Sequence, residues 1–328
     1  MRKVIFLKKR ENRNNDLKAG DELMTIERKS CLFCQQEQSL LPIKQEYICD
    51  ECLNEGNGER MTQWEASLQK RMNDYKHFCK RCIKVSDPED IHQARVTGRK
   101  LKSILQFLGV KKKHPVLVRI KRIHKLLNII READVFIEAF EKREKKNKAY
   151  KEMVKKVTKK RRSFQKELQS QMPSIMNADL FHDWEQFLSK ELAFYVLTLE
   201  KDKRLNEYEQ RFSYKIDTYH KAVKTYGKQH SKSIEALHKV RIQSKSLRYI
   251  YKELSDMMDQ NFNSEKEYYK KIQTQFGAIN DVQDWLSKVK QYKNKLNASQ
   301  KDIGHVKKKL KIQLKEMIEN VDLPRPNN

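Results

Sequence analysis

The chain has 328 residues and a net charge of +27 at pH 7, from 71 Lys and Arg against 44 Asp and Glu. With only 8 glycines, 6 prolines and 35% charged residues, the composition argues against a turn-rich β protein and for long helices. No apolar run reaches the roughly 18 residues of a membrane-spanning helix, so we expect no membrane insertion. The first residues lack the form of a signal peptide, and the expected location is therefore the cytoplasm.

The positive charge is confined to the part of the chain after residue 60. Residues 1–60 contain 11 basic and 11 acidic side chains, and subtracting these from the totals of 71 and 44 leaves 60 and 33. An excess of this size repels itself, and an anionic partner would relieve the repulsion. Nucleic acid, a membrane surface and polyphosphate are all partners that this composition allows.

Residues 1–30 have no clear periodicity and are expected to be poorly ordered. Two C-x-x-C pairs follow, Cys31 with Cys34 and Cys49 with Cys52, separated by fourteen residues that suit a short hairpin. Four thiolates at this spacing can surround one tetrahedral zinc ion. We predict a zinc-ribbon-like segment over residues 31–58 with a structural Zn, because four thiolates leave no open position for catalysis. Reduced cysteines without metal are the alternative, and the sequence does not specify a protein partner for this segment.

A helical pattern starts at Met61 after a polar linker, residues 53–60. It contains a third cysteine pair, Cys79 and Cys82, which share one helix face. Core packing is the expected role of this pair, while a redox pair and a second metal site stay open.

The next helix, residues 91–108, carries a basic stripe beside its apolar face. Asp87 and Pro88 suit the start of this helix, and Gly109 suits its end. At about 100° per residue, four side chains fall within an arc of roughly 80°. These are His92, Arg95, Arg99 and Lys102, with Lys100 to one side.

The following elements are a helix over 116–140 and a strongly basic segment over 141–169. The helix ends in a run that contains Arg131 and Asp134. The basic segment either is a solvated helix face or widens an anion-binding surface. Residues 170–178, which contain Pro173, are expected to interrupt the helical pattern. Further helices are expected over 180–199 and 206–226.

The basic stripe recurs over residues 237–254 with the same spacing. The matching side chains are His238, Arg241, Lys245 and Arg248. A later run with Asn280 and Asp281 matches the run with Asp134. An internal repeat of this kind indicates one supersecondary unit used twice, and the stripes by themselves predict an anion-binding groove.

The repeated H-x-x-R-x-x-x-[RK] helix, followed each time by an acidic run, resembles the conserved histidine α-helical domain, CHAD, over roughly residues 62 to 320. The resemblance implies an all-α fold of two pseudo-symmetric helical bundles, tandem four-helix-type repeats around a basic channel that binds inorganic polyphosphate. The helical domain is expected over 61–322, with a first half of about 61–170 and a second of about 180–322. The implied polyphosphate-binding residues are His92, Arg95, Arg99, Lys100, Lys102, Arg131, His238, Arg241, Lys245 and Arg248. Asp134 and Asp281 are expected to orient basic neighbours, or to form internal salt bridges.

Catalysis is not expected, because the chain has neither a Gly-rich phosphate loop nor a carboxylate metal site of the kind that phosphoryl transfer uses. The alternative function is binding of RNA or DNA by a basic protein with a zinc ribbon. Single-strand binders place aromatic rings in the groove, and only Tyr249 lies near a stripe. Polyphosphate is the expected partner, nucleic acid a competing polyanion, and association with polyphosphate granules is left open.

Overall fold

The structure is a computed structural model that describes residues 29–43, 46–54, 58–143, 147–258, 260–321 and 323. The chain divides into two compact units, Met1–Met61 and Thr62–Asn328. The segment expected to be poorly ordered, residues 1–30, lies outside the described residues except for its last two. None of the described helices is long and apolar enough to cross a membrane.

The N-terminal unit is built around a two-stranded antiparallel hairpin. It consists of β1 (Leu40–Ile43), β2 (Glu46–Cys49) and the short helix α1 (Asp50–Asn54). Pro42 pairs with Tyr47 across the strands, and the backbone N–H of Leu32 donates to the Tyr47 carbonyl at 2.7 Å. The hairpin expected between the two C-x-x-C pairs is therefore present.

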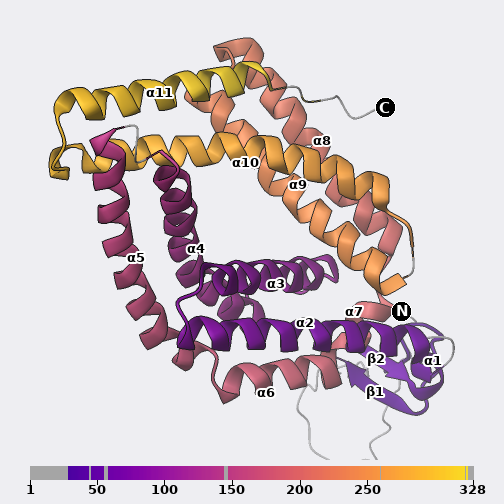
Figure 1. Ribbon diagram of the computed structural model, residues 1–328. Helices are drawn as coiled ribbons and strands as arrows, with labels where there is room; N and C mark the ends of the chain where they lie inside the picture. The colour runs from indigo at the N-terminus through magenta and orange to yellow at the C-terminus, as the bar shows by residue number, and fades with distance from the viewer. Residues whose placement is uncertain are drawn as a thin grey trace, which may run out of the picture. The chain divides into compact units, whose positions relative to one another are not determined.

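The second unit is all helical and contains two sets of four long helices in the same chain order (Figure 1). The first set is α2 (Gly58–Lys84), α3 (Pro88–Phe107), α4 (Pro115–Glu141) and α5 (Lys148–Ile175). The second set is α8 (Lys201–Tyr226), α9 (Ser231–Met258), α10 (Asn263–Tyr292) and α11 (Gln300–Glu319). In each set the second helix carries the histidine and the basic stripe.

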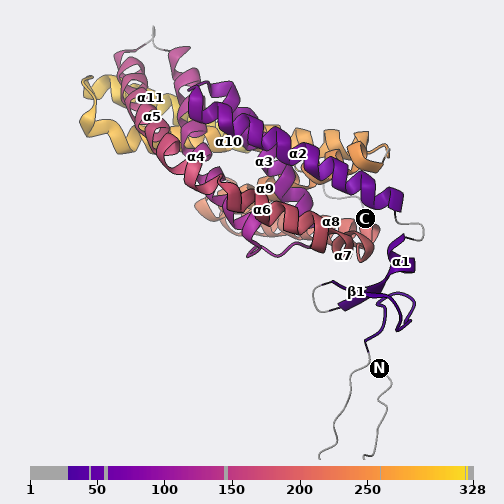
Figure 2. The same cartoon turned by 90° about the horizontal axis from the view of Figure 1, so that it is seen from below.

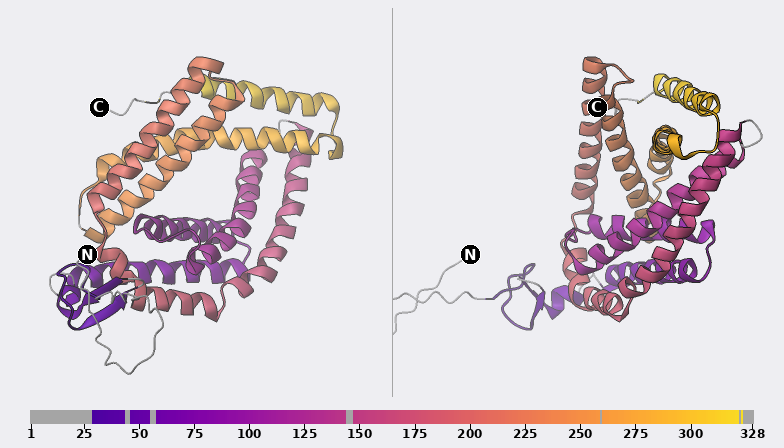
Figure 3. Two further views of the ribbon diagram at one scale, coloured as in Figure 1. Left: turned by 180° about the vertical axis from the view of Figure 1, so that it is seen from behind. Right: turned by 90° about the vertical axis from the view of Figure 1, so that its left-hand side faces the viewer.

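Several pairs of consecutive long helices lie side by side. Figure 3 shows this plainly for α8 with α9 and for α10 with α11, and both pairs are in contact. In the first set α4 contacts both α3 and α5. The predicted pair of similar helical bundles is thus confirmed.

A connecting segment between the two sets folds back along α2. It comprises α6 (Ala178–Gln186), a turn of π-helix (Phe187–Glu191) and α7 (Leu192–Leu197). Figures 1 and 2 show α6 running beside α2, where the Trp184 indole N–H donates to the Gln69 amide oxygen at 2.8 Å. The predicted single helix over 180–199 is therefore divided.

Among the described residues, two of the contacts between the halves of the helical unit are extensive. In one, α3 contacts α9, so the two stripe-bearing helices meet. In the other, the end of α4 and the start of α5 pack against α10 and α11 around stacked Phe136 and Phe140, whose ring centroids are 3.8 Å apart. Tyr150 and Trp285 contact the Phe140 ring edge to face. Burial of these large apolar side chains is the main force that holds the halves together.

The first stripe-bearing helix starts and ends where its sequence indicates. The Asp87 side chain accepts a hydrogen bond from the Glu89 backbone N–H at 2.9 Å, and Pro88 is the first helical residue. Gly109 has a φ of +96°, a left-handed conformation that favours glycine and terminates the helix. The expected break around Pro173 begins late, because α5 continues through this proline to Ile175. Met172 and Ile175 are buried there, and apolar packing offsets the single lost hydrogen bond.

Gly98 of α3 permits close packing against α2. An ideal Cβ at this position would lie 2.5 Å from a ring carbon of Tyr75, whose side chain is fully buried. Alanine would gain about 1 kcal/mol of helix propensity, but overpacking a rigid core costs roughly 1–3 kcal/mol. We expect Gly98→Ala to lower the free energy of unfolding by about 1 kcal/mol in chemical denaturation.

The matched control is Gly304→Ala in α11, where a Cβ would meet nothing within 4 Å. This change should raise the free energy of unfolding by up to about 1 kcal/mol. A Gly98→Ala protein stabilised to the same degree would contradict the close approach of α3 to α2.

Candidate functional site

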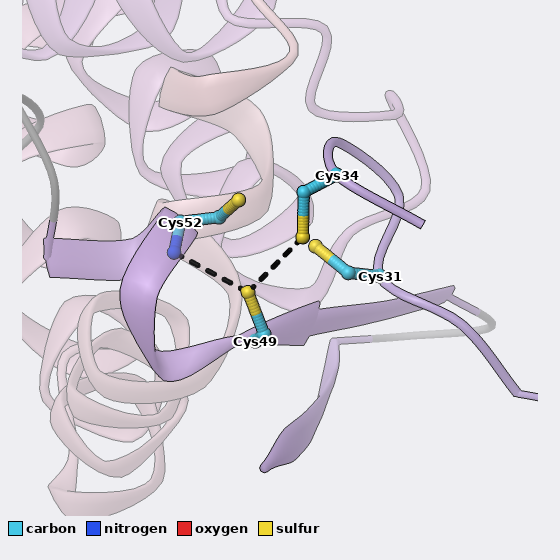
Figure 4. A group of neighbouring side chains, drawn as sticks. All are labelled: Cys31, Cys34, Cys49 and Cys52. Carbon is cyan, nitrogen blue, oxygen red and sulfur yellow. Dashed lines mark hydrogen bonds between the residues drawn. The ribbon is translucent and has the colours of Figure 1, made fainter. Parts of the chain in front are cut away.

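The four predicted metal ligands come together in the N-terminal unit. The Sγ atoms of Cys31, Cys34, Cys49 and Cys52 all lie within 4.8 Å of one another. Figure 4 shows the thiols pointing toward a common centre, with Cys34 Sγ and Cys49 Sγ 3.5 Å apart. Four sulfur ligands in this arrangement are compatible with a tetrahedral metal site.

Backbone N–H groups point at the sulfur atoms of the cluster. Phe33 N donates to Cys31 Sγ and Cys52 N to Cys49 Sγ, each at 3.4 Å. Gln35, just after the first pair, adopts a φ of +62°, which tightens this turn. Burial acts to raise the pKa of the Cys31 thiol, but backbone hydrogen bonds outweigh it and lower that pKa to about 6. The backbone of this turn thus favours the thiolate of Cys31, the form that binds metal, while the neighbouring Cys34 thiol raises the pKa of Cys52.

Cys79 and Cys82 are fully buried within the helical unit. Burial is the main cause that raises the pKa of the Cys82 thiol to about 12, and burial also raises the pKa of Cys79. Thiols that stay protonated and inaccessible are poor metal ligands and poor nucleophiles. This environment fits the core-packing role expected from their helical spacing.

The cations of the two stripes converge where α3 meets α9. We call six of them the basic cluster: Arg95, Arg99 and Lys102 on α3, and Arg241, Lys245 and Arg248 on α9. All six side chains are half-buried. Arg99 is the link between the halves, because its charge acts on Arg95 and Lys102 of its own helix and on Arg241 and Lys245 of α9.

Lys245 lies at the most crowded point of the basic cluster. Burial, and then the positive charges of Arg99 and Arg241, lower the pKa of Lys245 to about 6. Burial and the charge of Arg99 also lower the pKa of Arg95, although a guanidinium keeps its proton in proteins. A cluster that holds this much unneutralised charge is unfavourable in the free protein, and an anion placed there would be strongly attracted.

Neutral amide oxygens orient several of these side chains. Arg95 Nε donates to Asn128 Oδ1 at 2.8 Å, and Arg248 Nη1 donates to Gln273 Oε1 at 3.0 Å. An amide acceptor positions a guanidinium without cancelling its charge. The orienting amides Asn128 and Gln273 were not recognised in the sequence, because they lie 33 and 25 residues from the arginines they contact.

The two stripe histidines have different environments. His92 is half-buried, and burial together with the charge of Arg131 lowers its pKa. His238 is exposed, and its Nδ1 forms a 2.8 Å hydrogen bond with Asn280 Oδ1. The charge of Arg131 therefore acts on a residue of the first stripe.

Lys100 points to a different part of the interface between the halves. Its Nζ lies 3.7 Å from Glu253 Oε1, and Glu253 is fully buried and also paired with Arg71. The Arg71 Nη2 atom donates to Asp256 Oδ2 at 3.1 Å. Lys100, one of the predicted polyphosphate ligands, therefore has a carboxylate partner and lies apart from the basic cluster.

The two predicted supporting acids have separate roles. Asp134 is buried and accepts a hydrogen bond from Arg161 Nε of α5 at 2.7 Å. Arg161 Nη2 also donates to the Ser86 carbonyl oxygen at 3.0 Å, which ties α5 to the turn before α3. Asp134 is thus part of an internal salt bridge. Asp281 is half-buried; burial raises its pKa, and the Arg241 charge opposes that shift.

One histidine near the basic cluster was missed in the sequence. His124 of α4 is only 8% exposed, and the charges that act on it come from Arg95, Arg99, Lys102 and Lys245. Burial is the first cause that lowers its pKa to about 3, so the ring is neutral. The sequence does place His124 on the apolar face of its helix, four residues after Ile120 and three before Leu127, and a histidine at such a position could have been recognised as buried.

The geometry defines a class of protein: an internally repeated, all-helical unit whose two halves bring basic stripes to one shared cluster. The sequence model of the CHAD domain family matches residues 66–289 of this chain, which is more than half of it. The chain therefore belongs to the CHAD domain family.

A solved structure supports the fold. The crystal structure of the CHAD domain from the plant Ricinus communis is similar with a TM-score of 0.57 and 14% sequence identity. The match covers 80% of this chain and 92% of the plant domain. Among curated protein sequences none matches significantly.

Proposed function

We propose that this protein binds inorganic polyphosphate at the basic cluster, without a catalytic step of its own. One observation carries the proposal: Lys245 of the second half is crowded by Arg95 and Arg99 of the first half. Six basic side chains on two contacting helices suit a flexible polymer with a negative charge on every phosphate. Arginines offer forked donors to phosphate oxygens and lysines offer point charges.

The orientation of the cluster supports binding over catalysis. Amide oxygens hold Arg95 and Arg248, while the acids whose charges act on the cluster are Glu132, Asp281 and Asp284, which act on Arg95 or Arg241. Carboxylates that could hold Mg²⁺ beside a reacting phosphate are the usual requirement for phosphoryl transfer. The cluster instead offers what a static anion site needs, which is concentrated positive charge.

Tyr249 is the aromatic residue near a stripe on which the alternative function, nucleic-acid binding, depends. Its side chain is only 8% exposed, and it lies close enough to Arg95 and Arg241 to act on both charges. A buried ring cannot serve as a platform on which bases stack, and single-strand binding draws much of its affinity from such stacking. Polyphosphate is therefore the better-supported ligand.

A competition experiment tests this function. Labelled long-chain polyphosphate is bound to the protein at physiological salt and displaced by unlabelled polyphosphate, RNA or DNA. We expect unlabelled polyphosphate to act at phosphate concentrations at least about tenfold below those of either nucleic acid, because bases add bulk without stacking partners. Displacement by RNA at equal or lower concentration would establish the nucleic-acid function in place of the proposed one.

We further propose that the cysteine cluster binds one structural zinc ion through Cys31, Cys34, Cys49 and Cys52. Zinc is the metal that four thiolates in a C-x-x-C pair arrangement typically hold. Purified protein should contain about one zinc per chain by elemental analysis. The Cys31→Ser/Cys49→Ser protein should contain none, because two thiolates do not complete a tetrahedral site.

The matched control is Cys79→Ser/Cys82→Ser, which should keep its zinc. Polyphosphate binding should survive loss of the metal, because residues 1–60 carry no net charge. Zinc retained in the Cys31→Ser/Cys49→Ser protein and lost in the control would assign the metal to Cys79 and Cys82.

A further inference from the structure

The outer face of α5 carries a further row of basic side chains, none of which belongs to the basic cluster. All of them occupy exposed positions of the helix. Their spacing of three or four residues places them within an arc of roughly 80°, at about 100° per residue. We call them the α5 row. Its members are Lys148, Lys151, Lys155, Lys159, Arg162 and Lys166.

The α5 row lies opposite the buried face of its helix. Tyr150, Val157 and Leu168 are buried on the other side, where α5 contacts α4. Figure 1 shows α5 along an edge of the helical unit, with α4 on its inner side. At 1.5 Å per residue the row extends for about 27 Å. A row of this length at the edge of the unit can meet a large partner along its whole length.

No salt bridge with a described carboxylate neutralises the α5 row. Other exposed lysines of the chain pair with acids three or four residues away, such as Lys142 with Glu138 at 2.8 Å and Lys270 with Glu267 at 3.0 Å. Each member of the α5 row instead has another member three or four residues away. Like charges at this spacing destabilise a helix, so the row lowers the stability of the free protein.

The corresponding helix of the second half lacks such a row. Buried residues align α5 with α11, because Tyr150 then matches Ile303 and Val157 matches Leu310. The six α11 positions that correspond to the α5 row are also exposed, but three lysines and one glutamate give them a net charge of +2 against +6. They are Lys301, Gly304, Lys308, Ile312, Lys315 and Glu319. The repeated fold therefore does not require a uniformly basic face at this place.

The composition of the α5 row favours a flat anionic surface as its partner. Five of its six members are lysines, whereas four of the six residues in the basic cluster are arginines. Lysine is a hydrated point charge and lacks the planar fork with which arginine recognises individual phosphates. A strand of B-form duplex makes a full turn in roughly 34 Å, so it cannot follow a straight row of this length. An anionic lipid bilayer is flat over that distance and attracts basic segments through its headgroups.

We propose that the α5 row binds the surface of membranes that contain anionic lipid. This function is additional to polyphosphate binding and does not depend on it, because the α5 row and the basic cluster share no residue. None of the large hydrophobic residues of α5 is exposed, so the contact is peripheral and electrostatic. Binding therefore weakens as salt screens the charges.

Cosedimentation of the full-length protein with vesicles tests the proposal. The probe is phosphatidylcholine vesicles that contain phosphatidylserine, with vesicles of phosphatidylcholine alone as the reference. The variant Lys151→Gln/Lys155→Gln/Lys159→Gln should bind the anionic vesicles at least about 100-fold more weakly than the wild type, because each lysine near such a surface contributes about fivefold. Its melting temperature should equal or exceed that of the wild type, because like charges have been removed. Its affinity for polyphosphate should stay close to that of the wild type.

The matched control removes the same charge from exposed positions of α11, with Lys308→Gln/Lys311→Gln/Lys315→Gln. This variant should keep most of its affinity for the anionic vesicles. Equal losses in the two triple variants, or wild-type binding that is the same with and without phosphatidylserine, would overturn the proposal. A loss of duplex RNA binding with vesicle binding intact in the α5 variant would assign the row to nucleic acid instead. An equal loss of polyphosphate and vesicle affinity in that variant would overturn the separate role of the row.

Discussion

Replacing Arg95 and Arg99 by glutamate should reduce affinity for long-chain polyphosphate by at least about 100-fold. Each arginine contributes a charged hydrogen bond worth about 1.5–3 kcal/mol, so the loss of two exceeds the roughly 2.7 kcal/mol that corresponds to that factor. Repulsion between the new carboxylates and phosphate adds to the loss. Fluorescence titration at several salt concentrations measures both the affinity and the salt slope, which should become shallower because fewer counterions are released.

The matched control reverses two exposed charges of α5, Lys159→Glu/Lys160→Glu. It leaves out Arg161, whose salt bridge with Asp134 is internal. Equal losses in the two double variants would mean that binding is spread over a diffuse basic surface. A loss of RNA binding with polyphosphate binding intact in the Arg95/Arg99 variant would instead support the nucleic-acid alternative.

A double variant that replaces one basic residue in each half by an uncharged one distinguishes weakened binding from misfolding. Arg99→Gln/Lys245→Gln removes the most crowded contact of the basic cluster, in which the Arg99 charge lowers the pKa of Lys245. Below a pH of about 6, where both side chains are charged in the free protein, removing this repulsion should leave the melting temperature unchanged or raised, while affinity for polyphosphate falls. Stability rises while affinity falls only if the like charges destabilise the free protein and attract the anionic ligand.

Binding of polyphosphate should become tighter as pH falls from 8 to 6, by about tenfold per pH unit. Burial first, and then the charges of Arg99, Arg241, Arg95 and Arg248, lower the pKa of Lys245 to about 6 in the free protein. His124 of α4 and Asp281 of α10 also face this lysine. A bound polyanion neutralises the surrounding cations and raises the pKa of Lys245 above the working range.

The direction of this pH dependence follows from the number of protons that the free protein and the complex bind. Between pH 6 and 8 Lys245 is neutral in the free protein and charged in the complex, so binding takes up one proton and is favoured by acid. Below a pH of about 6 both states carry the proton and the dependence should level off. Calorimetric titration in buffers of different ionisation enthalpy measures the uptake directly.

The control for this pH dependence is a lysine on the same helix. Lys245→Met should abolish most of the proton uptake, whereas Lys252→Met, at an exposed position, should preserve it. Long chains are the appropriate ligand, because their titrating end groups are a small fraction of the phosphates. Affinity that is flat between pH 6 and 8, or that rises toward pH 8, would show that Lys245 is already charged in the free protein.

Local sequence features determined the elements that bear the candidate sites. Asp87, Pro88 and Gly109 mark the ends of α3 because capping and left-handed turns depend on a few adjacent residues. The spacing of His92, Arg95, Arg99 and Lys102 places them on one helix face for the same local reason. The spacing of the four cysteines likewise anticipated a cluster that the hairpin closes. Family resemblance extended these observations to a repeated all-helical fold.

Only the tertiary structure decided how the two stripes relate to each other. Contact between α3 and α9 sets Arg99 against Lys245, two residues separated by more than a hundred positions in the chain. The same packing buries His124 among four basic side chains and turns Lys100 toward Glu253. Helical periodicity states which face a side chain occupies, but the neighbour of that face depends on apolar packing between distant helices. For this reason the sequence determined the basic stripes, and the packing of the halves alone decided which of their charges meet.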